Sequence, residues 1–547
     1  MINSYKCWLE KSFYKEELES IQNEGEIIDR FYQTLSFGTG GMRGKIGAGT
    51  NRINLHTIRL VAEGLAREIE LQGETAKMRG VVIAYDTRHF SQEFAYETAG
   101  VLAAHEINCY LFKESRPTPE LSFAVRYLNA YAGVVITASH NPKQYNGFKV
   151  YGEDGAQLTP RFADKIMAHM EEVGDIFSIK ALNFEELLAS EFCTKIGKQI
   201  DEAYNNALKV FATPKNKELT LVYSPLHGAG LEPIRRALTE AGFTNLHIVE
   251  EQAIQSGEFP TIVYPNPEEA DVFELAMELG QQTGAELLLA TDPDADRLGV
   301  AVRNGENYVL LTGNQLGALL LHYLLQTRET PANGAMIKTI VTSELGAAIA
   351  NKSGVTTINT LTGFKFIAEK IAEWERTGEY SFLFGYEESY GYLAGDFVRD
   401  KDAVQTALLT AEMAAYYKEQ GKTLLNMLDE LYEEFGWYKE SLLSIAFEGV
   451  EEQQRMASIM SSFRRKPPTK FAETIIVKVE DYSLGNVNGL PKADVIKFIL
   501  ADDSSVCIRP SGTEPKCKFY IGVKKESAEA SEEMIEMLKK ALINLIK

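Results

Sequence analysis

The length, composition and charge of the chain limit what it can be. It has 547 residues, 45 % hydrophobic and 24 % charged, as in an ordinary globular protein, and at about 150 residues per domain this length predicts three or four domains. The formal net charge of −21 argues against duplex nucleic acid as a main partner, because such binding needs a concentrated basic face. A small anionic substrate is not excluded, since a few local arginines can determine the electrostatic potential of a cleft.

Cysteine usage and the distribution of apolar residues indicate the compartment. The cysteines are odd in number and form no CxxC pair: Cys7, Cys109, Cys193, Cys507 and Cys517. This pattern indicates a reducing compartment, without a disulfide framework or a zinc site. The first 20 residues are too charged for a signal peptide, and no apolar run approaches the ~20 residues of a membrane span. We therefore expect a cytoplasmic protein with no membrane partner.

Strand-like and helix-like segments alternate in three cycles. The expected strands are residues 80–85, 107–112 and 132–137, then 219–223, 246–249 and 286–290, then 337–342, 356–359 and 381–384. The expected helices are residues 92–104, 119–128, 231–241, 268–279, 345–351 and 364–374. Alternation of this kind predicts βαβ units and largely parallel sheets. We expect three related α/β domains with mixed, largely parallel sheets, at residues 1–205, 206–315 and 316–440, although no residue-level repeat is visible.

The pattern changes in the last hundred residues. Closely spaced strands are expected at residues 474–479, 495–501, 505–508 and 516–523, followed by one helix from about residue 528. Adjacent strands with short connections favour antiparallel pairing. The predicted fold is therefore completed by a C-terminal α+β domain at residues 441–547.

The first motif is residues 137–142 (TASHNP), directly after the expected buried strand that ends at residue 137. An apolar run followed by Asn-Pro places Ser139 at the carboxyl edge of a sheet, where open α/β folds bind their ligands. A serine that carries a phosphoryl group must be exposed near a divalent cation and near proton-handling or cationic groups, and His140 and Lys149 are available locally. Alone, a Ser-His-Asn-Pro run would be better explained as an ordinary turn.

The second motif is residues 291–297 (TDPDADR), after a second apolar run. Carboxylates at alternate positions, Asp292, Asp294 and Asp296, can turn toward one centre, and a cation relieves their mutual repulsion. Hard oxygen ligands suit Mg²⁺. An EF-hand is excluded because Arg297 and Arg303 stand where that loop needs Gly and Glu. The remaining alternative is a solvated acidic turn.

Two further motifs suit a phosphorylated sugar. Residues 385–391 (GYEESYG) place Glu387 and Ser389 on a glycine-bounded loop, where carboxylate and hydroxyl groups can bind vicinal sugar hydroxyls. Residues 508–516 (IRPSGTEPK) combine the guanidinium fork of Arg509 with a run that favours converging backbone N–H groups, Ser511, Gly512 and Thr513. Each is weak alone, since a surface turn has a similar composition.

Together the four motifs, in this order, resemble those of the α-D-phosphohexomutases, and the Glu-Glu-Ser loop is most similar to that of the phosphoglucomutase branch. The resemblance extends from Arg43 to Lys518 and identifies the serine as the phosphoryl carrier. It implies an active-site cation at Arg43, in a glycine-rich segment, and a lysine near the reaction centre at Lys401. It also implies substrate contacts at Arg297, Thr362, Gly363 and Lys518. Where family phosphomannomutases have a histidine, this chain has Gly391.

The family's reaction is what the resemblance implies for activity. Phosphorylated Ser139, with one Mg²⁺ held by the three aspartates, would exchange its phosphoryl group with glucose 1-phosphate or glucose 6-phosphate through glucose 1,6-bisphosphate. The Arg509 loop would hold the phosphate that does not react. The partner would be a small phosphosugar, and the oligomeric state stays open between monomer and dimer.

Rival functions come from the same fold and from outside it. Phosphopentomutase, phosphomannomutase and hexose 1,6-bisphosphate synthase activities stay open, because small shape differences in the loops separate them. A sugar-phosphate binding protein without catalysis is disfavoured, because binding alone would not require Ser139, three aspartates and Arg509 together. A serine hydrolase is disfavoured because Ser139 lacks the glycine-flanked nucleophile elbow.

Overall fold

The computed structural model describes residues 2–35, 37, 41–213, 217–447, 450–510 and 516–546. The chain forms two compact units. Unit 1 comprises Met1–Thr312, Ala368–Thr377 and Ser389–Glu419, and unit 2 comprises Gly313–Ile367, Gly378–Glu388 and Gln420–Lys547. Each unit is therefore assembled from segments that are not continuous in sequence.

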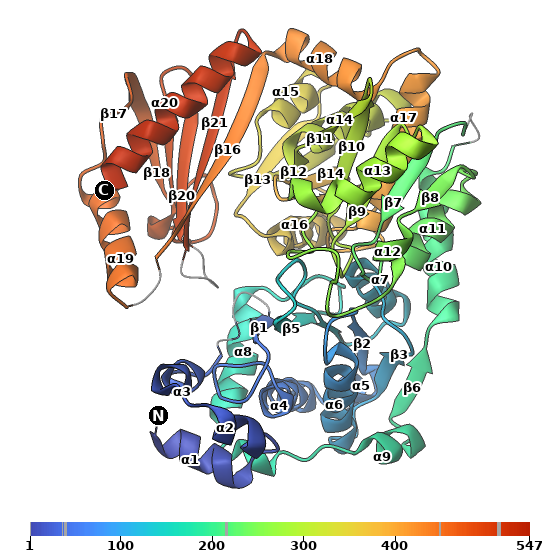
Figure 1. Ribbon diagram of the computed structural model, residues 1–547, viewed down its shortest axis with the longest axis vertical. Coiled ribbons are helices and arrows are strands. Elements are labelled where there is room, and N and C mark those ends of the chain that lie inside the picture. The colour runs from blue at the N-terminus through green and yellow to red at the C-terminus, as the bar shows by residue number, and fades with distance from the viewer. Residues whose placement is uncertain are drawn as a thin grey trace. The chain divides into compact units, whose positions relative to one another are not determined.

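The first sheet of unit 1 has the strand order β1-β5-β4-β2-β3-β6 (Figure 1). Its strands are β1 Gly41–Lys45, β2 Val81–Tyr85, β3 Cys109–Phe112, β4 Ala132–Ile136, β5 Tyr145–Tyr151 and β6 Cys193–Ile196. The pairs among β4, β2, β3 and β6 are parallel, whereas β5 pairs antiparallel with both β4 and β1. The loop between β4 and β5 therefore leaves the carboxyl edge of the parallel strands and returns at the same edge.

Helices cover both faces of this sheet. They are α4 Leu55–Leu71, α5 Glu74–Arg79, α6 Ser91–Ala104, α7 Thr118–Tyr127, α8 Pro160–Glu171 and α9 Phe184–Ala189, and three short helices precede them: α1 Ile2–Lys11, α2 Lys15–Ser20 and α3 Glu24–Phe31. Helices α4 and α6 share one buried core with β2, β3 and β4, while α7 packs on β2 and β4 outside that core. A capping box between Asn54 and Thr57 fixes the start of α4.

The second sheet of unit 1 has the order β11-β10-β9-β7-β8. Its strands are β7 Leu221–Ser224, β8 Leu246–Ile248, β9 Leu287–Thr291, β10 Leu298–Asn304 and β11 Asn307–Leu311. The associated helices are α10 Lys198–Leu208, α11 Leu231–Glu240, α12 Glu250–Ala253, α13 Glu274–Thr283 and α17 Ala403–Lys418. Strands β9, β7 and β8 are parallel, and β10 pairs antiparallel with β9 and β11. Helix α17 packs on α11, β9 and β10, and so brings residues near position 400 to this sheet.

Unit 2 contains three parallel strands and an antiparallel sheet. The parallel strands belong to a four-stranded sheet with β15, Gly391–Leu393, as one edge strand. The parallel strands are β12 Gly334–Thr339, β13 Thr356–Thr360 and β14 Ser381–Glu387, with helices α14 Gly313–Thr327, α15 Leu345–Lys352 and α18 Leu424–Phe435. Helix α16, Phe364–Thr377, begins in unit 2 and continues into unit 1.

The antiparallel sheet of unit 2 has the order β16-β21-β20-β19-β18-β17. Its strands are β16 Trp437–Ala446, β17 Lys470–Phe471, β18 Thr474–Asp481, β19 Ile496–Leu500, β20 Ser505–Pro510 and β21 Lys516–Lys525. Helix α20, Ala528–Ile546, crosses β16 and β21, and α19, Val450–Arg465, shares their core (Figure 1). The C-terminal α+β arrangement was predicted, and the structure has it.

Two predicted elements are displaced. The helix expected at 268–279 begins only with α13 at Glu274, after a short 3₁₀ turn at Ala270–Phe273. The strand expected at 337–342 ends at Thr339, because the chain turns there: the Thr342 amide donates to the Thr339 carbonyl at 3.2 Å. Across the described ranges, no helix is long and apolar enough to span a bilayer. The domain boundaries stay predictions.

Candidate active site

Ser139 lies in the loop that joins β4 to β5, here called the serine loop (residues 137–145). It is 3 % exposed and has φ of +52°, a left-handed conformation that costs a residue with a side chain about 1–2 kcal/mol. Its amide donates to Thr137 Oγ1 at 2.8 Å, which helps to fix the turn. This backbone directs the hydroxyl toward two groups: Ser139 Oγ donates to Asp292 Oδ2 at 2.7 Å and lies 3.1 Å from His140 Nδ1.

The three predicted aspartates follow β9 and converge. Asp292, Asp294 and Asp296 are buried, and one carboxylate oxygen of each lies within 4.8 Å of the others. Ala295 between them has φ of +47°, and the amides of Asp296 and Arg297 donate to Asp292 Oδ1 at 3.2 and 3.0 Å. Strand β9 is therefore followed by a tight turn, which brings three carboxylates together beside Ser139.

The electrostatics of these carboxylates fit a divalent cation. Burial, together with Asp294 and Asp296, holds the pKa of Asp292 well above its usual range, because three ionised carboxylates repel one another in a dry site. Among the described residues, Asp294 Oδ1 and Asp296 Oδ1 are buried and have no hydrogen-bond partner. Unpaired buried oxygens on acidic side chains are the hard ligands that Mg²⁺ prefers.

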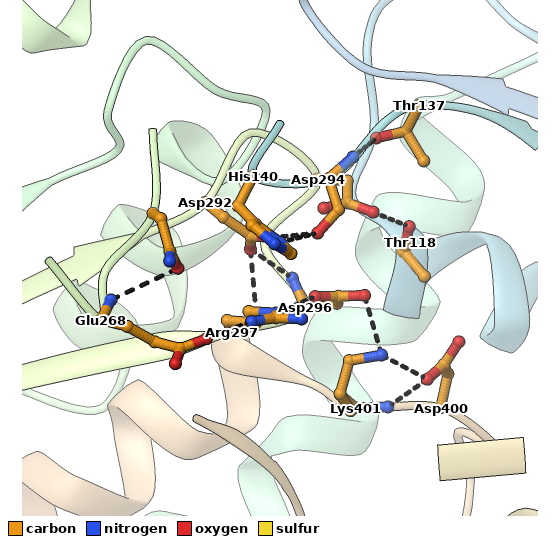
Figure 2. A network of polar contacts seen from close by, with 12 residues as sticks. Thr118, Thr137, His140, Glu268, Asp292, Asp294, Asp296, Arg297, Asp400 and Lys401 are labelled. Atoms are coloured by element: carbon orange, nitrogen blue, oxygen red, sulfur yellow. Dashed lines mark hydrogen bonds and ion pairs between the residues drawn. The ribbon is translucent and has the colours of Figure 1, made fainter. Parts of the chain in front are cut away.

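Two lysines face Asp296 from different elements, and Figure 2 shows one of them, Lys401. Lys149 Nζ on β5 lies 2.8 Å from Asp294 and 3.6 Å from Asp296, and Lys401 Nζ lies 2.9 Å from Asp296 and 3.1 Å from Asp400. Burial opposes the charge of Lys149, but Asp294 and Asp296 raise its pKa overall. Lys149 is therefore cationic at neutral pH.

The remaining predicted residues of the reaction centre are also in unit 1. Arg43 Nη1 on β1 donates to Asn141 Oδ1 at 2.8 Å, and Arg297 at the start of β10 pairs with Glu268. Burial, followed by the positive charges of Arg297 and Arg43, holds the pKa of His140 well below its usual value. His140 is therefore a neutral imidazole next to the serine hydroxyl.

Sequence reasoning missed several groups that complete this network. Thr118 at the start of α7 donates to Asp294 Oδ2 at 2.8 Å, and its amide donates to the Asp294 carbonyl at 2.9 Å (Figure 2). Tyr151 donates to Asp400 Oδ2 at 2.9 Å, which orients the partner of Lys401. Lys401 was named from the family resemblance, whereas the contacts of Thr118 and Tyr151 follow only from the topology.

The predicted sugar and phosphate loops belong mainly to unit 2. Glu387 at the end of β14 accepts the Gly363 amide at 2.8 Å, and Thr362 Oγ1 is buried with no hydrogen-bond partner in the described part of the chain. Arg509 on β20 lies opposite Lys518 on β21. Ser389 is half-buried in the turn after β14 and is part of unit 1, and Ser511, Gly512 and Thr513 lie outside the described residues.

Comparison with known proteins establishes the family. Four regions match phosphoglucomutase/phosphomannomutase models: alpha/beta/alpha domains I (34–176), II (200–305) and III (312–435), and the C-terminal domain (475–540). The chain is 39 % identical over 529 residues to a phosphoglucomutase of Staphylococcus aureus (strain MSSA476), covering 94 % of this chain and 93 % of that protein. The chain belongs to the phosphoglucomutase/phosphomannomutase family. The resemblance seen in the sequence is thereby confirmed, and the protein is a phosphosugar mutase.

Solved structures of the phosphohexomutases share the fold. A putative phosphomannomutase from Thermus thermophilus has a TM-score of 0.71 at 24 % identity, covering 93 % of this chain and 99 % of that one. The open form of a phosphoglucomutase from Paramecium, pp63/parafusin, has a TM-score of 0.67 at 18 % identity, with coverage of 93 % and 95 %. The predicted fold class, three α/β domains followed by an α+β domain, is confirmed.

Proposed function

We propose that this mutase is a phosphoglucomutase that interconverts glucose 1-phosphate and glucose 6-phosphate through a phosphoserine at Ser139. The main support is the contact of 2.7 Å between Ser139 Oγ and Asp292 Oδ2, which places the hydroxyl at the edge of the aspartate cluster. The proposal includes four functional domains divided near residues 205, 315 and 440.

In the proposed reaction a phosphoryl group and a proton move in opposite directions. A hydroxyl of the sugar monophosphate attacks the phosphorus on Ser139 Oγ, the Oγ–P bond breaks, and glucose 1,6-bisphosphate forms. The proton of that hydroxyl reaches Ser139 Oγ by way of His140 Nδ1, which is neutral and 3.1 Å away. After the bisphosphate turns over, the same groups act in reverse on its other phosphate.

The chain's own charges support this transfer. Asp292, Asp294 and Asp296 would hold one Mg²⁺, which when bound would neutralise negative charge on the transferring phosphoryl group. Lys149 on β5 contacts Asp294 and Asp296, and Lys401, just before α17, contacts Asp296, so both would supply fixed positive charge. Arg43 and Arg297 add two further cations around the serine loop.

Glucose is favoured over mannose by one observation at Gly391. A Cβ built on Gly391 would lie 2.2 Å from Lys401 Cδ and 2.7 Å from its Cγ, so a larger side chain there would displace Lys401. Family phosphomannomutases have a histidine at the matching position. The combination of Gly391 with Lys401 therefore supports the phosphoglucomutase assignment.

Substrate recognition is proposed for the loops of residues 362–363, 387–389 and 509–518. Glu387 and Ser389 would bind sugar hydroxyls, with Thr362 and Gly363 beside them. The phosphate that does not react would be held by Arg509, Ser511, Gly512, Thr513 and Lys518. The sugar must bind in two orientations during the reaction. Glu387 should therefore hydrogen-bond equatorial hydroxyls that occupy the same place in both orientations.

The test is a comparison of substrates with the purified protein. Glucose 1-phosphate, mannose 1-phosphate and ribose 1-phosphate would be assayed with Mg²⁺ and catalytic hexose 1,6-bisphosphate, and the phosphoryl adduct mapped by mass spectrometry. We expect the highest kcat/KM on glucose 1-phosphate and an adduct on Ser139. A higher kcat/KM on either other sugar, or an adduct on a different residue, contradicts the proposed function.

A further inference from the structure

A buried arginine outside the four motifs holds the serine loop. Arg88 follows β2, its side chain is fully buried, and its guanidinium donates to four main-chain carbonyls of the loop. Two of these bonds go to the carbonyls of Ser139 and Asn141, and two go to Pro142 at 2.9 Å and Tyr145 at 3.1 Å. The loop's main chain is therefore gathered around one planar cation.

The cation is itself fixed by a counter-ion on the same turn. Arg88 Nε lies 3.3 Å from Asp86 Oδ2, and neither side chain is exposed. Asp86 Oδ1 also accepts the Arg88 amide at 3.0 Å and Ser91 Oγ at 2.6 Å. Separating a buried ion pair leaves an uncompensated charge in a dry site, which is strongly destabilising, so Asp86 keeps Arg88 in place.

An aromatic ring covers Arg88 from the second sheet's loops. The ring centroid of Phe259 lies 5.0 Å from the guanidinium carbon. The segment that carries Phe259 is tied down by His227, whose ring nitrogens contact the Ile254 carbonyl at 2.8 Å and Thr261 Oγ1 at 2.9 Å. The same segment packs closely against the turn after β2. A Cβ added at Gly257 would lie only 2.4 Å from the amide nitrogen of His89.

The geometry points to Arg88 as a positioning residue for phosphoryl transfer: its fork holds the serine loop in the left-handed turn that aims Ser139 Oγ at Asp292. The inference rests on the proposed role of Ser139. Arg88 acts through the main chain and need not touch the substrate. A lysine could keep the charge, but its single ammonium cannot reproduce a planar fork on four carbonyls.

The test compares Arg88→Lys with Arg79→Lys. Arg79 is a matched control, because it also donates to two main-chain carbonyls, those of Asn129 at 2.9 Å and Ala130 at 3.2 Å, but not in the serine loop. We expect Arg88→Lys to lower kcat about 100-fold with KM changed less than about threefold, since small misplacements of a reacting group have effects of this size. Arg79→Lys should keep kcat within about twofold of wild type.

A local readout separates positioning from general damage. Hydrogen exchange of amides in residues 137–145 should accelerate in Arg88→Lys and stay at the wild-type rate in Arg79→Lys. Millimolar guanidinium should restore part of the turnover lost in Arg88→Ala, because the free ion can bind where the arginine side chain was and donate to the same carbonyls. Wild-type kcat in Arg88→Lys, or a fall in kcat without faster exchange in the loop, would overturn the inference.

A second variant and a measurement on the wild-type protein cover the case in which the Arg88 variants do not fold. If the Arg88 variants do not fold, Phe259→Leu keeps an apolar side chain over the guanidinium without the ring, and it should lower kcat several-fold and speed exchange in the loop; unchanged values overturn the inference. A phosphoryl adduct on wild-type Ser139 is recorded in the same experiment. Its absence would contradict the proposed function, whereas its presence beside an unaffected Arg88→Lys contradicts only the role of Arg88.

Discussion

The proposed reaction centre in unit 1 and the predicted recognition loops in unit 2 are built differently. In unit 1 the charged groups are buried against one another: Lys149 and Lys401 pair with buried aspartates, and Ser139 donates to Asp292. In unit 2 Arg509 and Lys518 are half-buried on neighbouring strands next to a segment outside the described residues. Three residues around the reaction centre, Ser139, Ala295 and Tyr390, also have positive φ.

This difference indicates a division of labour. Strained backbone and paired buried charges are stable only where the surrounding structure determines them, so the groups proposed for phosphoryl transfer in unit 1 are preorganised. Half-buried cations on strand ends suit a ligand that must be bound and released in two orientations. Changes in unit 1 should therefore act mainly on kcat, and changes in unit 2 mainly on KM.

The largest effect is expected for Ser139→Ala. Removing the proposed phosphoryl carrier should lower turnover by roughly 10⁴-fold or more while the protein stays folded. Mutase kinetics and intact-mass analysis would measure this, and Ser178→Ala, on an exposed turn of the same unit, is the control. Turnover close to wild type in Ser139→Ala would remove the proposed chemistry from unit 1.

Asp294→Asn should have the next largest effect. The substitution removes an anionic ligand and the partner of Lys149, so turnover should fall roughly 10³-fold and Mg²⁺ affinity should weaken. Wild-type activity should also disappear in EDTA and return with Mg²⁺. Asp271→Asn, an exposed carboxylate near α13, is the control, and metal titration identical to wild type in Asp294→Asn would mean that the turn is only structural.

Arg509→Ala tests the other side of the comparison. Loss of a charged hydrogen bond to phosphate, worth about 1.5–3 kcal/mol, should raise KM for glucose 1-phosphate by about 10- to 100-fold, with a smaller fall in kcat. Arg509→Lys should recover part of the loss. Arg464→Ala, which breaks ion pairs with Asp481 and Asp494 in the same unit, is the control. Should KM stay unchanged in Arg509→Ala, the phosphate site lies elsewhere.

The smallest effect concerns the pH dependence of unit 2. Burial raises the pKa of Glu440 on β16 to about 7, although Ser343 and Asn314 hydrogen-bond the carboxylate. The folded state thus keeps a proton that the unfolded chain releases near pH 4.5, so this group's contribution to stability falls as pH rises from about 4.5 through 7. Glu440→Gln stays neutral and should gain about 2 °C in Tm relative to wild type at about pH 8, with little gain at about pH 5.

Calorimetry would measure the Tm of wild type and Glu440→Gln between about pH 5 and pH 8, with Glu433→Gln, at an exposed position, as the control. A difference in Tm that is independent of pH would show that Glu440 does not titrate between the folded and unfolded states. Either way, turnover at neutral pH should change far less than in the unit 1 variants.

The sequence was sufficient for the parts of the site that are short and continuous. The serine and aspartate motifs each fit within one turn after a buried strand, so their residues could be named before the structure was known. The partners Thr118 and Asp294 are separated by 176 positions, and Tyr151 and Asp400 by 249, so no local pattern connects them. Arg88 was missed for the same reason, since its four acceptors are main-chain carbonyls that leave no trace in residue type.

Elements were missed where local signals were weak or misread. Helix α4 was not predicted, although Asn54 and Thr57 form its capping box. The antiparallel strand β10 was hidden because Arg297 and Leu298 follow the aspartate turn without a separate turn signal. The roles of the four motifs stay predictions, although the structure brings Ser139 to within 2.7 Å of Asp292.

Because unit 1 is built from three separate segments of the chain, some of its contacts can form only late in synthesis. Tyr151 must wait for Asp400, 249 positions later, and at about 5–20 residues per second the ribosome needs roughly 12–50 s to cover that distance. Once residue 296 has been made, the chain has its serine and its three aspartates but not Lys401, so Asp296 still lacks its contact of 2.9 Å with that lysine. The newborn protein therefore cannot complete the proposed reaction centre until two segments of unit 2, Gly313–Ile367 and Gly378–Glu388, have also been translated.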